Sequence, residues 1–336
     1  MMENPGLIEA HALYYTAPSQ TELRRVNVPF MAAEKFGECV LIKAQWSGIS
    51  RGTERLVYQG RIPSSEYCTM RAPFQEGEFP FPVKYGYSCV GSVEEGPPEM
   101  LGRHVFVLHP HQDFFRVPIA WVTALPDEVP PRRAILTANM ETALNAVWDA
   151  GALPGDRIAV VGAGALGLLI AGIVSQLPGA EVAVADINEA RKPVAAMFGA
   201  RFVKPDDLLD YDADVVFHTS ASEGGLAASI GAAGFEARIV EASWYGDGAI
   251  SAILGGSFHS KRLRLISTQV GAVSNARRAR WTAKRRVHKA LDLLAGERFD
   301  HLITGEVSFR GLPEAMPKIF DPDPSSIVTA VRYGAV

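Results

Sequence analysis

The sequence predicts an α/β protein with two parts, a β-rich domain followed by a Rossmann-type, doubly wound parallel sheet. Short strand-like runs between glycine and proline turns fill residues 1–122, whereas strands and helices alternate from residue 156 onward. In the alternating part, an apolar run at 158–161 is followed by the turn Gly162-Ala-Gly164-Ala-Leu-Gly167 and an apolar helix. A second strand, 181–186, then ends in the carboxylate of Asp186. This combination is typical of a fold that binds a dinucleotide.

Length and element order divide the chain into three segments. Its 336 residues can form two domains with separate cores. We expect the β-rich domain at 1–122, a dinucleotide-binding domain at 123–299, and a C-terminal segment, 300–336, that returns to the first domain. A helical segment is expected from Pro131 to about Ala150. The expected strands of the parallel sheet are 157–162, 181–186, 213–218, 237–242 and 263–268, and the last segment adds strand-like runs at 304–309 and 326–332.

Composition and charge argue against several classes of partner. The chain is 48% hydrophobic with a formal net charge of −4, which gives no general attraction to nucleic acid or to anionic membranes. No apolar run approaches the roughly 18–20 residues that span a bilayer, and the first residues carry no signal-peptide pattern. The three cysteines, Cys39, Cys68 and Cys89, form neither a disulfide framework nor a zinc motif. We expect a cytoplasmic protein that acts on a small molecule.

The glycine turn and Asp186 have complementary roles in the predicted cofactor site. Gly162, Gly164 and Gly167 allow a tight turn, a close approach of the backbone to a pyrophosphate, and close packing of helix on strand. The free N–H groups at the helix start, at Ala165 and Leu166, then face the phosphate charge. A carboxylate at position 186 can accept hydrogen bonds from both ribose hydroxyls of NAD, whereas it repels the 2′-phosphate of NADP. The sequence therefore predicts NAD as the cofactor.

Several segments, in this order, resemble motifs of the medium-chain dehydrogenase/reductase superfamily. They are Gly48-Ile-Ser-Arg-Gly-Thr-Glu54, Tyr85-Gly-Tyr-Ser-Cys-Val-Gly-Ser-Val93, Met140-Glu-Thr-Ala-Leu-Asn-Ala-Val147, Pro154-Gly-Asp-Arg-Ile-Ala-Val-Val-Gly-Ala-Gly-Ala-Leu-Gly167 and Ala185-Asp-Ile-Asn188. The resemblance covers nearly the whole chain. It implies a GroES-like catalytic domain beside the Rossmann domain, an NAD(P)-dependent oxidoreductase activity, and a homodimer joined through the edges of the cofactor-domain sheets.

The positions that resemble the zinc ligands of this superfamily carry other residues here. They read Ser50, Tyr87 with Ser88, and Thr137 or Ala138, depending on the alignment. Hydroxyls do not ionise near neutral pH and are poor ligands for Zn²⁺. The structural zinc lobe is also missing, because the stretch 86–117 holds one cysteine. We expect neither zinc ion. His109, His111 and Glu54 are the residues left for an unconventional metal site.

Without zinc, another group must stabilise or protonate the substrate oxygen. The resemblance makes Tyr87, Ser50 and Thr53 the candidates, with Tyr87 first because a phenol can donate a hydrogen bond and pass a proton. Alternatively, Tyr87 and Ser50 fill the space that the metal site would occupy. Glu54 is either a supporting base or the partner of Arg51 in a structural salt bridge. His109 is either part of a proton relay with the nearby histidine or a residue of a surface loop.

The resemblance also assigns further positions to the cofactor. Arg51 would contact the pyrophosphate and Arg191 the adenosine ribose, where a guanidinium could also admit NADP. Thr219 and Ser220 would border the adenine ribose, and the segment from Ser267 to Gly271 would pass the nicotinamide carboxamide. Thr142, in the helix before the cofactor domain, completes the cofactor set. Each of these residues could instead have an ordinary structural role in a loop.

Residues 275–289 form a basic segment with seven Lys and Arg residues. Val287, Leu291 and Leu294 recur at helical spacing, which predicts an amphipathic helix with a basic face. Such a face is usually solvated. A sharper hypothesis is that it steers an anionic substrate into an interdomain cleft.

These observations favour a zinc-independent, NAD(H)-dependent oxidoreductase that transfers hydride between nicotinamide and a secondary alcohol or ketone. Two short motifs, Gly48-Ile-Ser-Arg-Gly-Thr-Glu54 and Gly86-Tyr-Ser-Cys-Val-Gly91, look most like the bacteriochlorophyllide hydroxyethyl dehydrogenases. One alternative is an NADPH-dependent quinone or enone reductase, whose conjugated acceptor needs no metal. Another is a catalytically silent protein that binds a dinucleotide.

Overall fold

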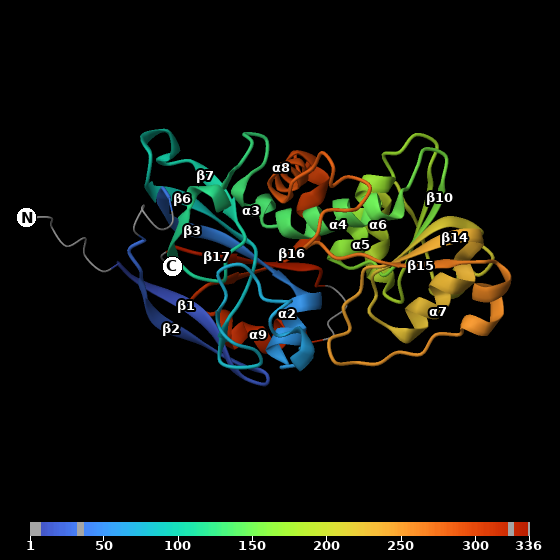
Figure 1. The fold of residues 1–336 in the computed structure, drawn as a ribbon, viewed down its shortest axis with the longest axis horizontal. Coiled ribbons are helices and arrows are strands. Elements are labelled where there is room, and N and C mark those ends of the chain that lie inside the picture. The colour runs from blue at the N-terminus through green and yellow to red at the C-terminus, as the bar shows by residue number, and fades with distance from the viewer. Residues whose placement is uncertain (1–7, 32–36, 322–325, 335–336) are drawn as a thin grey trace, which may run out of the picture. The chain divides into compact units, whose positions relative to one another are not determined.

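The computed structural model describes residues 8–31, 37–321 and 326–334 (Figure 1). The chain forms two compact units. Unit 1 contains residues 1–138, 294–299 and 303–336, and unit 2 contains 139–293 and 300–302. The C-terminal segment therefore folds with the N-terminal part of the chain. In the part of the chain that the structure describes, no helix is both long and apolar enough to cross a membrane.

Unit 1 is built on two β-sheets. The smaller has the order β2-β1-β5-β4, and the larger has the order β16-β17-β3-β6-β7-β9, with β8 also paired to β3. The strands of the smaller sheet are β1 (Ile8–Ala17), β2 (Gln20–Val28), β4 (Glu76–Gly77) and β5 (Val83–Lys84). Those of the larger are β3 (Cys39–Ser50), β6 (Cys89–Glu95), β7 (His104–Val107), β8 (Phe114–Pro118), β9 (Thr123–Ala124), β16 (Ile303–Ser308) and β17 (Val328–Arg332). Strand β3 is central, because β17, β6 and β8 all pair with it.

Helices α2 (Arg51–Tyr58) and α9 (Leu312–Phe320) belong to unit 1, near the hairpin of β1 and β2 (Figure 1). Helix α2 begins directly after β3, so the last strand residue, Ser50, is also its N-cap. The rings of Tyr58 and Phe320 pack the two helices together, with centroids 5.0 Å apart. The sequence analysis expected only strands in the C-terminal segment and missed α9.

The helical segment expected at 131–150 is divided in the structure into α3 (Pro131–Ala134) and α4 (Thr137–Ala150). Residues 123–138, which the sequence analysis assigned to the cofactor domain, group with unit 1. The physical reason is contact with its sheet: Ser88 donates a 2.5 Å hydrogen bond to the carbonyl of Ile135. A Cβ at Gly48 would lie 3.0 Å from the same carbonyl oxygen, so strand and turn pack tightly.

Unit 2 contains a parallel sheet with the strand order β12-β11-β10-β13-β14-β15. Its strands are β10 (Arg157–Val161), β11 (Glu181–Ala185), β12 (Arg201–Val203), β13 (Ala213–His218), β14 (Ala233–Glu241) and β15 (Arg264–Ser267). In order along the unit this is 3-2-1-4-5-6, the arrangement of dinucleotide-binding Rossmann sheets. The expected strands are all present within a few residues, and the short β12 is an addition. The order reverses between β10 and β13, and ligands bind at the carboxyl ends of strands at such a point.

Helices cover the sheet of unit 2 as α/β alternation predicts. They are α5 (Ala165–Val174), α6 (Lys192–Met197) and α7 (Glu223–Ala232). Helix α8 (Ala283–Leu293) contacts α4. Helix α5 packs on β10 and β11, whereas α7 packs on β13, β10 and β14 (Figure 1). The core between helices and sheet consists of small and branched apolar side chains such as Val161, Val216 and Ile239. The sheet therefore presents the turn after β10 on a rigid support.

Candidate functional site

The glycine turn after β10 fits a dinucleotide-binding loop. Gly162 has a φ of +109°, and a Cβ there would lie 2.8 Å from the backbone nitrogen of Ser220. A Cβ at Gly167 would lie 1.9 Å from the carbonyl oxygen of Gly162, so α5 crosses the turn at a distance that only glycine allows. At Gly164, the N-cap of α5, a Cβ would meet no atom within 4 Å. The first and third glycines thus shape the turn, and the second leaves its outer side open.

The open side of the turn carries unpaired backbone donors. Ala165 and Leu166 form the first turn of α5, whose first N–H groups have no partner within the helix, and both residues are partly exposed. The helix dipole adds partial positive charge at this end. The turn therefore has the donors, the charge and the space that a pyrophosphate group requires.

Asp186 follows β11 and contacts the same turn. Its Oδ2 accepts a 2.6 Å hydrogen bond from the backbone N–H of Ala163, and its Oδ1 accepts one of 2.8 Å from Asn188. These bonds hold the carboxylate against the glycine turn. An ionised carboxylate can accept about four hydrogen bonds, so lone pairs remain for ribose hydroxyls. This geometry fits the role that the sequence predicts for Asp186.

Thr219 and Ser220 follow β13 and border the turn from the neighbouring strand. The Thr219 hydroxyl donates to the carbonyl oxygen of Gly162 over 2.9 Å, and Ser220 is half-buried. The Ser220 hydroxyl is hydrogen-bonded to His218, which in turn pairs with Glu241 over 2.7 Å. Sequence reasoning missed His218 and Glu241, although each is the last residue of its strand, where site residues of a parallel sheet gather.

The remaining predicted cofactor residues lie in different surroundings. Arg191, in a short 3₁₀ helix after Asp186, is buried; Ser267 ends β15 and is exposed; Thr142 is half-buried in α4. Arg51 belongs to unit 1, where its guanidinium donates to the backbone carbonyls of Ser326 and Asp321. The structure brings together the glycine turn, Asp186, Thr219 and Ser220.

In unit 1, the predicted hydroxyl residues form one cluster. Ser50 ends β3 and Thr53 lies in the first turn of α2, and both side chains hydrogen-bond the phenol of Tyr87. Burial, followed by the nearby charge of Glu54, raises the pKa of Tyr87 well above its ordinary value. Tyr87 is therefore a protonated phenol throughout the physiological range, able to donate a hydrogen bond.

Glu54 lies at the centre of a buried network next to this cluster. Its Oε1 accepts from the backbone N–H of Ser50 over 3.0 Å. Its Oε2 accepts from the Tyr15 hydroxyl over 3.1 Å and lies 2.9 Å from Nε2 of His111. The side chains of Glu54 and His111 have no exposed surface. The side-chain partner of Glu54 is thus His111, whereas the sequence analysis had considered Arg51.

The network continues from His111 to the C-terminal strand. Nδ1 of His111 lies 2.7 Å from the Ser47 hydroxyl, which lies 3.0 Å from the Tyr333 hydroxyl. The cluster joins residues that are distant in sequence, so only the fold brings them together. His111 appeared in the sequence analysis, whereas Tyr15, Ser47 and Tyr333 carried no motif.

His109 has surroundings unlike those of His111. Its ring stacks on Phe115 with centroids 3.7 Å apart, and Nδ1 is hydrogen-bonded to the carbonyl of Pro110. Burial, reinforced by the charge of Lys84, lowers the pKa of His109 well below its ordinary value. The ring is therefore neutral and packed in the core, and the alternative of a surface loop does not hold.

Comparisons with known proteins agree with this architecture. No family model matches the chain. An uncharacterized zinc-type alcohol dehydrogenase-like protein of Haemophilus influenzae is 25% identical over 223 residues, which is 62% of this chain and 61% of that protein. The chain thus matches about three fifths of the length of that curated relative.

Solved structures match over almost the whole chain. A dehydrogenase from Sinorhizobium meliloti bound to NADP has a TM-score of 0.76 at 17% identity, covering 97% of this chain and 99% of that one. An alcohol dehydrogenase from Escherichia coli CFT073 in complex with NADH has a TM-score of 0.75 at 16% identity, covering 97% and 100%. This is the fold of the medium-chain dehydrogenase/reductases. The Rossmann sheet and the β-rich, GroES-like domain expected from the sequence are both confirmed.

The zinc positions of the medium-chain dehydrogenase/reductase fold carry a donor set that does not fit zinc. Tyr87 has a raised pKa, so its phenol does not supply an anionic oxygen. The hydroxyls of Ser88 and Thr137 donate to the backbone carbonyls of Ile135 and Ala134. Among the residues described, no three or more His, Cys, Asp or Glu side chains are grouped to hold a metal ion.

One residue of the basic segment, Arg286, departs from the expected solvated face, whereas its other six Lys and Arg residues are exposed or half-buried. Helix α8 begins at residue 283, and Arg286 is 2% exposed. Its guanidinium lies 2.9 Å from Oε1 of Glu141 and 2.5 Å from Oδ1 of Asn145, both on α4. It also donates to the carbonyls of Val270 and Ala272. Arg286 thus fastens the segment after β15 to α4, and a solvated basic face is wrong at this position.

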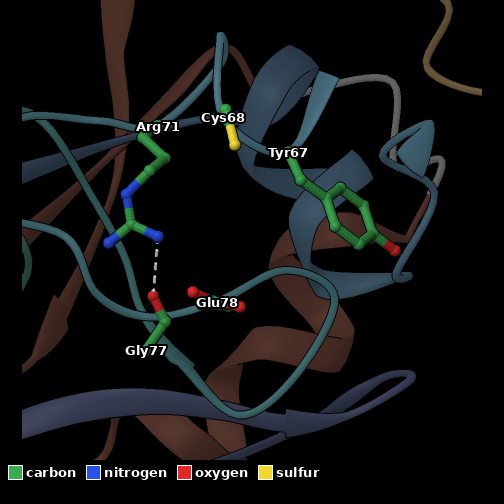
Figure 2. Close-up of a pocket in the computed structure, with 5 residues that line it drawn as sticks. All are labelled: Tyr67, Cys68, Arg71, Gly77 and Glu78. Atoms are coloured by element: carbon green, nitrogen blue, oxygen red, sulfur yellow. Dashed lines mark hydrogen bonds between the residues drawn. The ribbon is translucent and has the colours of Figure 1, made fainter. Parts of the chain in front are cut away.

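A pocket of about 450 Å³ in unit 1 contains none of the predicted site residues. Figure 2 shows Arg71 on one wall, donating to the carbonyl of Gly77 over 3.0 Å. The lining residues are Tyr67, Cys68, Arg71, Gly77 and Glu78. The second guanidinium nitrogen of Arg71 donates to the carbonyl of Gln75, so this arginine has a structural role in the loop.

Proposed function

We propose that the protein is a zinc-independent oxidoreductase that uses NAD(H) to interconvert a secondary alcohol and a ketone. The observation that carries this proposal is the glycine turn of unit 2, with an open side at Gly164 and the carboxylate of Asp186 bonded to its backbone. The chains of similar fold from Sinorhizobium meliloti and Escherichia coli hold NADP and NADH, respectively. When bound, a nicotinamide dinucleotide donates or accepts a hydride.

Asp186 supports a preference for NAD(H). Its charge and its free lone pairs favour two ribose hydroxyls and disfavour a phosphate at the 2′ position. The buried Arg191 is the residue that could offset this repulsion, because a guanidinium can pair with a phosphate. A comparison of NADH and NADPH affinities therefore measures whether repulsion by Asp186 or attraction by Arg191 is stronger.

The hydroxyl cluster of unit 1 supports the chemistry at the substrate oxygen. A ketone that receives a hydride develops negative charge on oxygen, and a fixed donor stabilises it. Tyr87 is protonated, and its phenol is oriented by Ser50 and Thr53. In the reverse direction the phenol keeps its own proton and stabilises the alkoxide form of the alcohol by a hydrogen bond, while the alcohol proton is released to solvent. Three positioned hydroxyls thus take the role that a Lewis acid has elsewhere.

The decisive experiment titrates the purified protein with NADH and NADPH, measures its metal content, and screens alcohols, ketones and quinones for turnover. We expect tighter binding of NADH, no stoichiometric zinc, and turnover of a secondary alcohol that falls in the Tyr87→Phe variant. The control is Tyr14→Phe, since Tyr14 is a half-buried tyrosine of unit 1 whose hydroxyl is bonded to Glu76 and not to the cluster. Stoichiometric zinc, tighter NADPH binding, or dinucleotide binding without turnover of any substrate would each contradict part of the proposal.

A further inference from the structure

A chain of hydrogen bonds joins the ends of β13 and β14 to the start of α7, beside the glycine turn. Oε2 of Glu241 lies 2.7 Å from Nδ1 of His218, and Nε2 of His218 lies 2.8 Å from the Ser220 hydroxyl. That hydroxyl is 2.9 Å from the hydroxyl of Ser222, which accepts a 3.1 Å hydrogen bond from the N–H of Gly225. The His218 side chain is fully buried. Its two ring nitrogens are therefore both committed within the protein.

Glu241 fixes the direction of every bond in this chain. The N–H of Ser243 donates to its Oε1 over 2.8 Å, and the Tyr245 hydroxyl donates to its Oε2 over 3.0 Å. Burial opposes the charge, but the hydrogen bonds from His218 and Ser243 outweigh it and hold the pKa of Glu241 below its ordinary value. An ionised carboxylate only accepts hydrogen bonds, so Nδ1 of His218 carries a proton.

The proton on Nδ1 of His218 determines which hydrogen bonds the Ser220 hydroxyl can make. In neutral His218 the Nε2 atom has no proton, so it accepts a hydrogen bond from the Ser220 hydroxyl. Ser222 accepts from Gly225 with its oxygen and directs its own proton to the Ser220 oxygen. A hydroxyl oxygen has two lone pairs, so one remains. Ser220 thus offers an incoming ligand one acceptor lone pair and no donor.

Ser220 lies where a dinucleotide on the glycine turn would meet it. Its backbone nitrogen is 2.8 Å from the position of a Cβ on Gly162, and its neighbour Thr219 donates to the Gly162 carbonyl. Asp186 accepts from Ala163 on the same turn. Two side chains that accept hydrogen bonds therefore border the turn, one from β11 and one from β13.

We propose that Glu241 and His218 are specificity-determining positioning residues, which hold Ser220 as an obligate acceptor for a hydroxyl group of the unphosphorylated dinucleotide. The inference rests on the proposed dinucleotide binding and adds a second determinant to Asp186. A phosphate brings only acceptor oxygens at neutral pH, so it finds no donor at Ser220. A ribose hydroxyl donates to Ser220 and is favoured.

The same three residues have the geometry of a Ser-His-acid triad, in which the serine is a nucleophile. One observation argues against that role. The N–H of Ala221, the donor that would follow the nucleophile in an oxyanion hole, is bonded to the Ser243 hydroxyl over 3.1 Å.

The test measures dissociation constants of NADH and NADPH by nicotinamide fluorescence at neutral pH. The proteins are the wild type, Ser220→Ala, His218→Phe, and the control His259→Asn, which removes an exposed histidine of unit 2. We expect Ser220→Ala to weaken NADH binding about three- to tenfold, the effect of one lost hydrogen bond, with little change for NADPH. His218→Phe should weaken NADH binding in the same way, because Ser220 loses the acceptor that orients its hydroxyl. The control should leave both affinities unchanged.

Several outcomes would overturn the inference. One is a Ser220→Ala variant with unchanged NADH affinity, and another is an equal loss of NADH and NADPH affinity in that variant. Covalent labelling of Ser220 by a fluorophosphonate would show a nucleophile and also refute the acceptor role. His218→Phe requires a thermal-unfolding check, but Ser220→Ala removes only a half-buried hydroxyl and keeps the test valid alone. A wild type that binds neither dinucleotide would instead refute the proposed function itself.

Discussion

Replacing Arg286 with methionine should destabilise the protein strongly, although the residue lies in a segment that looks like a solvated basic face. Arg286 is 2% exposed and the side chain of its partner Glu141 is 5% exposed. Removal of the guanidinium leaves a buried carboxylate without its cation, which costs about 3–5 kcal/mol. It also frees the carbonyls of Val270 and Ala272 and the amide oxygen of Asn145. We expect a loss of about 3–5 kcal/mol in the free energy of unfolding, measured by urea denaturation.

The adjacent Arg285 is a matched control. It is exposed and lies 4.0 Å from the centre of the Trp281 ring, a cation–π contact worth about 0.5–1 kcal/mol at an exposed site. Arg285→Met should therefore cost about 1 kcal/mol or less. Both variants remove one positive charge from the same helix, so their difference isolates burial and pairing. Equal losses in the two variants would refute the reasoning.

The pH dependence of the Arg286→Met variant provides an independent check. Burial raises the pKa of Glu141, and the charge of Arg286 partly offsets this effect. Without Arg286, the pKa of Glu141 rises further. A carboxyl with a raised pKa in the folded state loses stability as pH rises from its ordinary pKa through the raised one. The deficit of the variant should therefore be larger at pH 7 than at pH 5, and Glu141→Met in the same chain should recover much of it. A deficit that grows toward low pH would contradict this account.

Further predictions concern the two predicted sites. Gly167→Ala should abolish dinucleotide binding and lower the thermal midpoint, because its Cβ would lie 1.9 Å from a carbonyl oxygen, whereas Gly164→Ala should fold normally and weaken binding only. A thermal scan with and without NADH separates the two, and a stable Gly167→Ala that binds NADH would contradict the geometry. Asp186→Ser should raise the NADPH-to-NADH affinity ratio about tenfold or more in a fluorescence titration, since about 1.4 kcal/mol of charge repulsion corresponds to that factor; an unchanged ratio would contradict the charge argument. Glu54→Gln should lower the pKa of Tyr87, because the Glu54 charge raises it, and so bring an alkaline decline in ketone reduction to lower pH; an unmoved pH–rate profile would refute the coupling.

The cofactor half of the fold could be predicted because its signals are local. The turn at 162–167 needs glycine for reasons set by adjacent atoms, and Asp186 ends a strand whose length and apolar pattern are visible in the sequence. By contrast, helix α9 contains Pro317 and begins after Gly311, so its local sequence disfavours a helix although its apolar face is buried. In α9, burial of the apolar face therefore outweighs the low helix propensity of its sequence.

The site contacts that could not be predicted from the sequence join segments that are distant along the chain. Arg286 looks solvated among its basic neighbours until Glu141, which is 145 residues away, supplies its buried partner. His111 and Glu54 are 57 residues apart in the sequence. They meet because α2, which follows β3, lies next to the loop between β7 and β8. Burial of a charged side chain is decided by the fold as a whole, and no periodicity in a single segment reports it.

The buried Glu54–His111 pair bears on the chemistry of unit 1 because burying these polar side chains costs folding free energy. Both side chains are fully buried, and apolar residues of the same volume would usually stabilise a core at least as well. The pair instead places a carboxylate close enough to Tyr87 to raise the pKa of its phenol, with the backbone of Ser50 and the hydroxyl of Tyr15 holding that carboxylate in place. The zinc-independent chemistry that we propose needs a donor that stays protonated, and an adjacent fixed negative charge provides this condition. Under this proposal, the Glu54–His111 pair is kept in the core because it holds Tyr87 in the protonated form that the reaction requires.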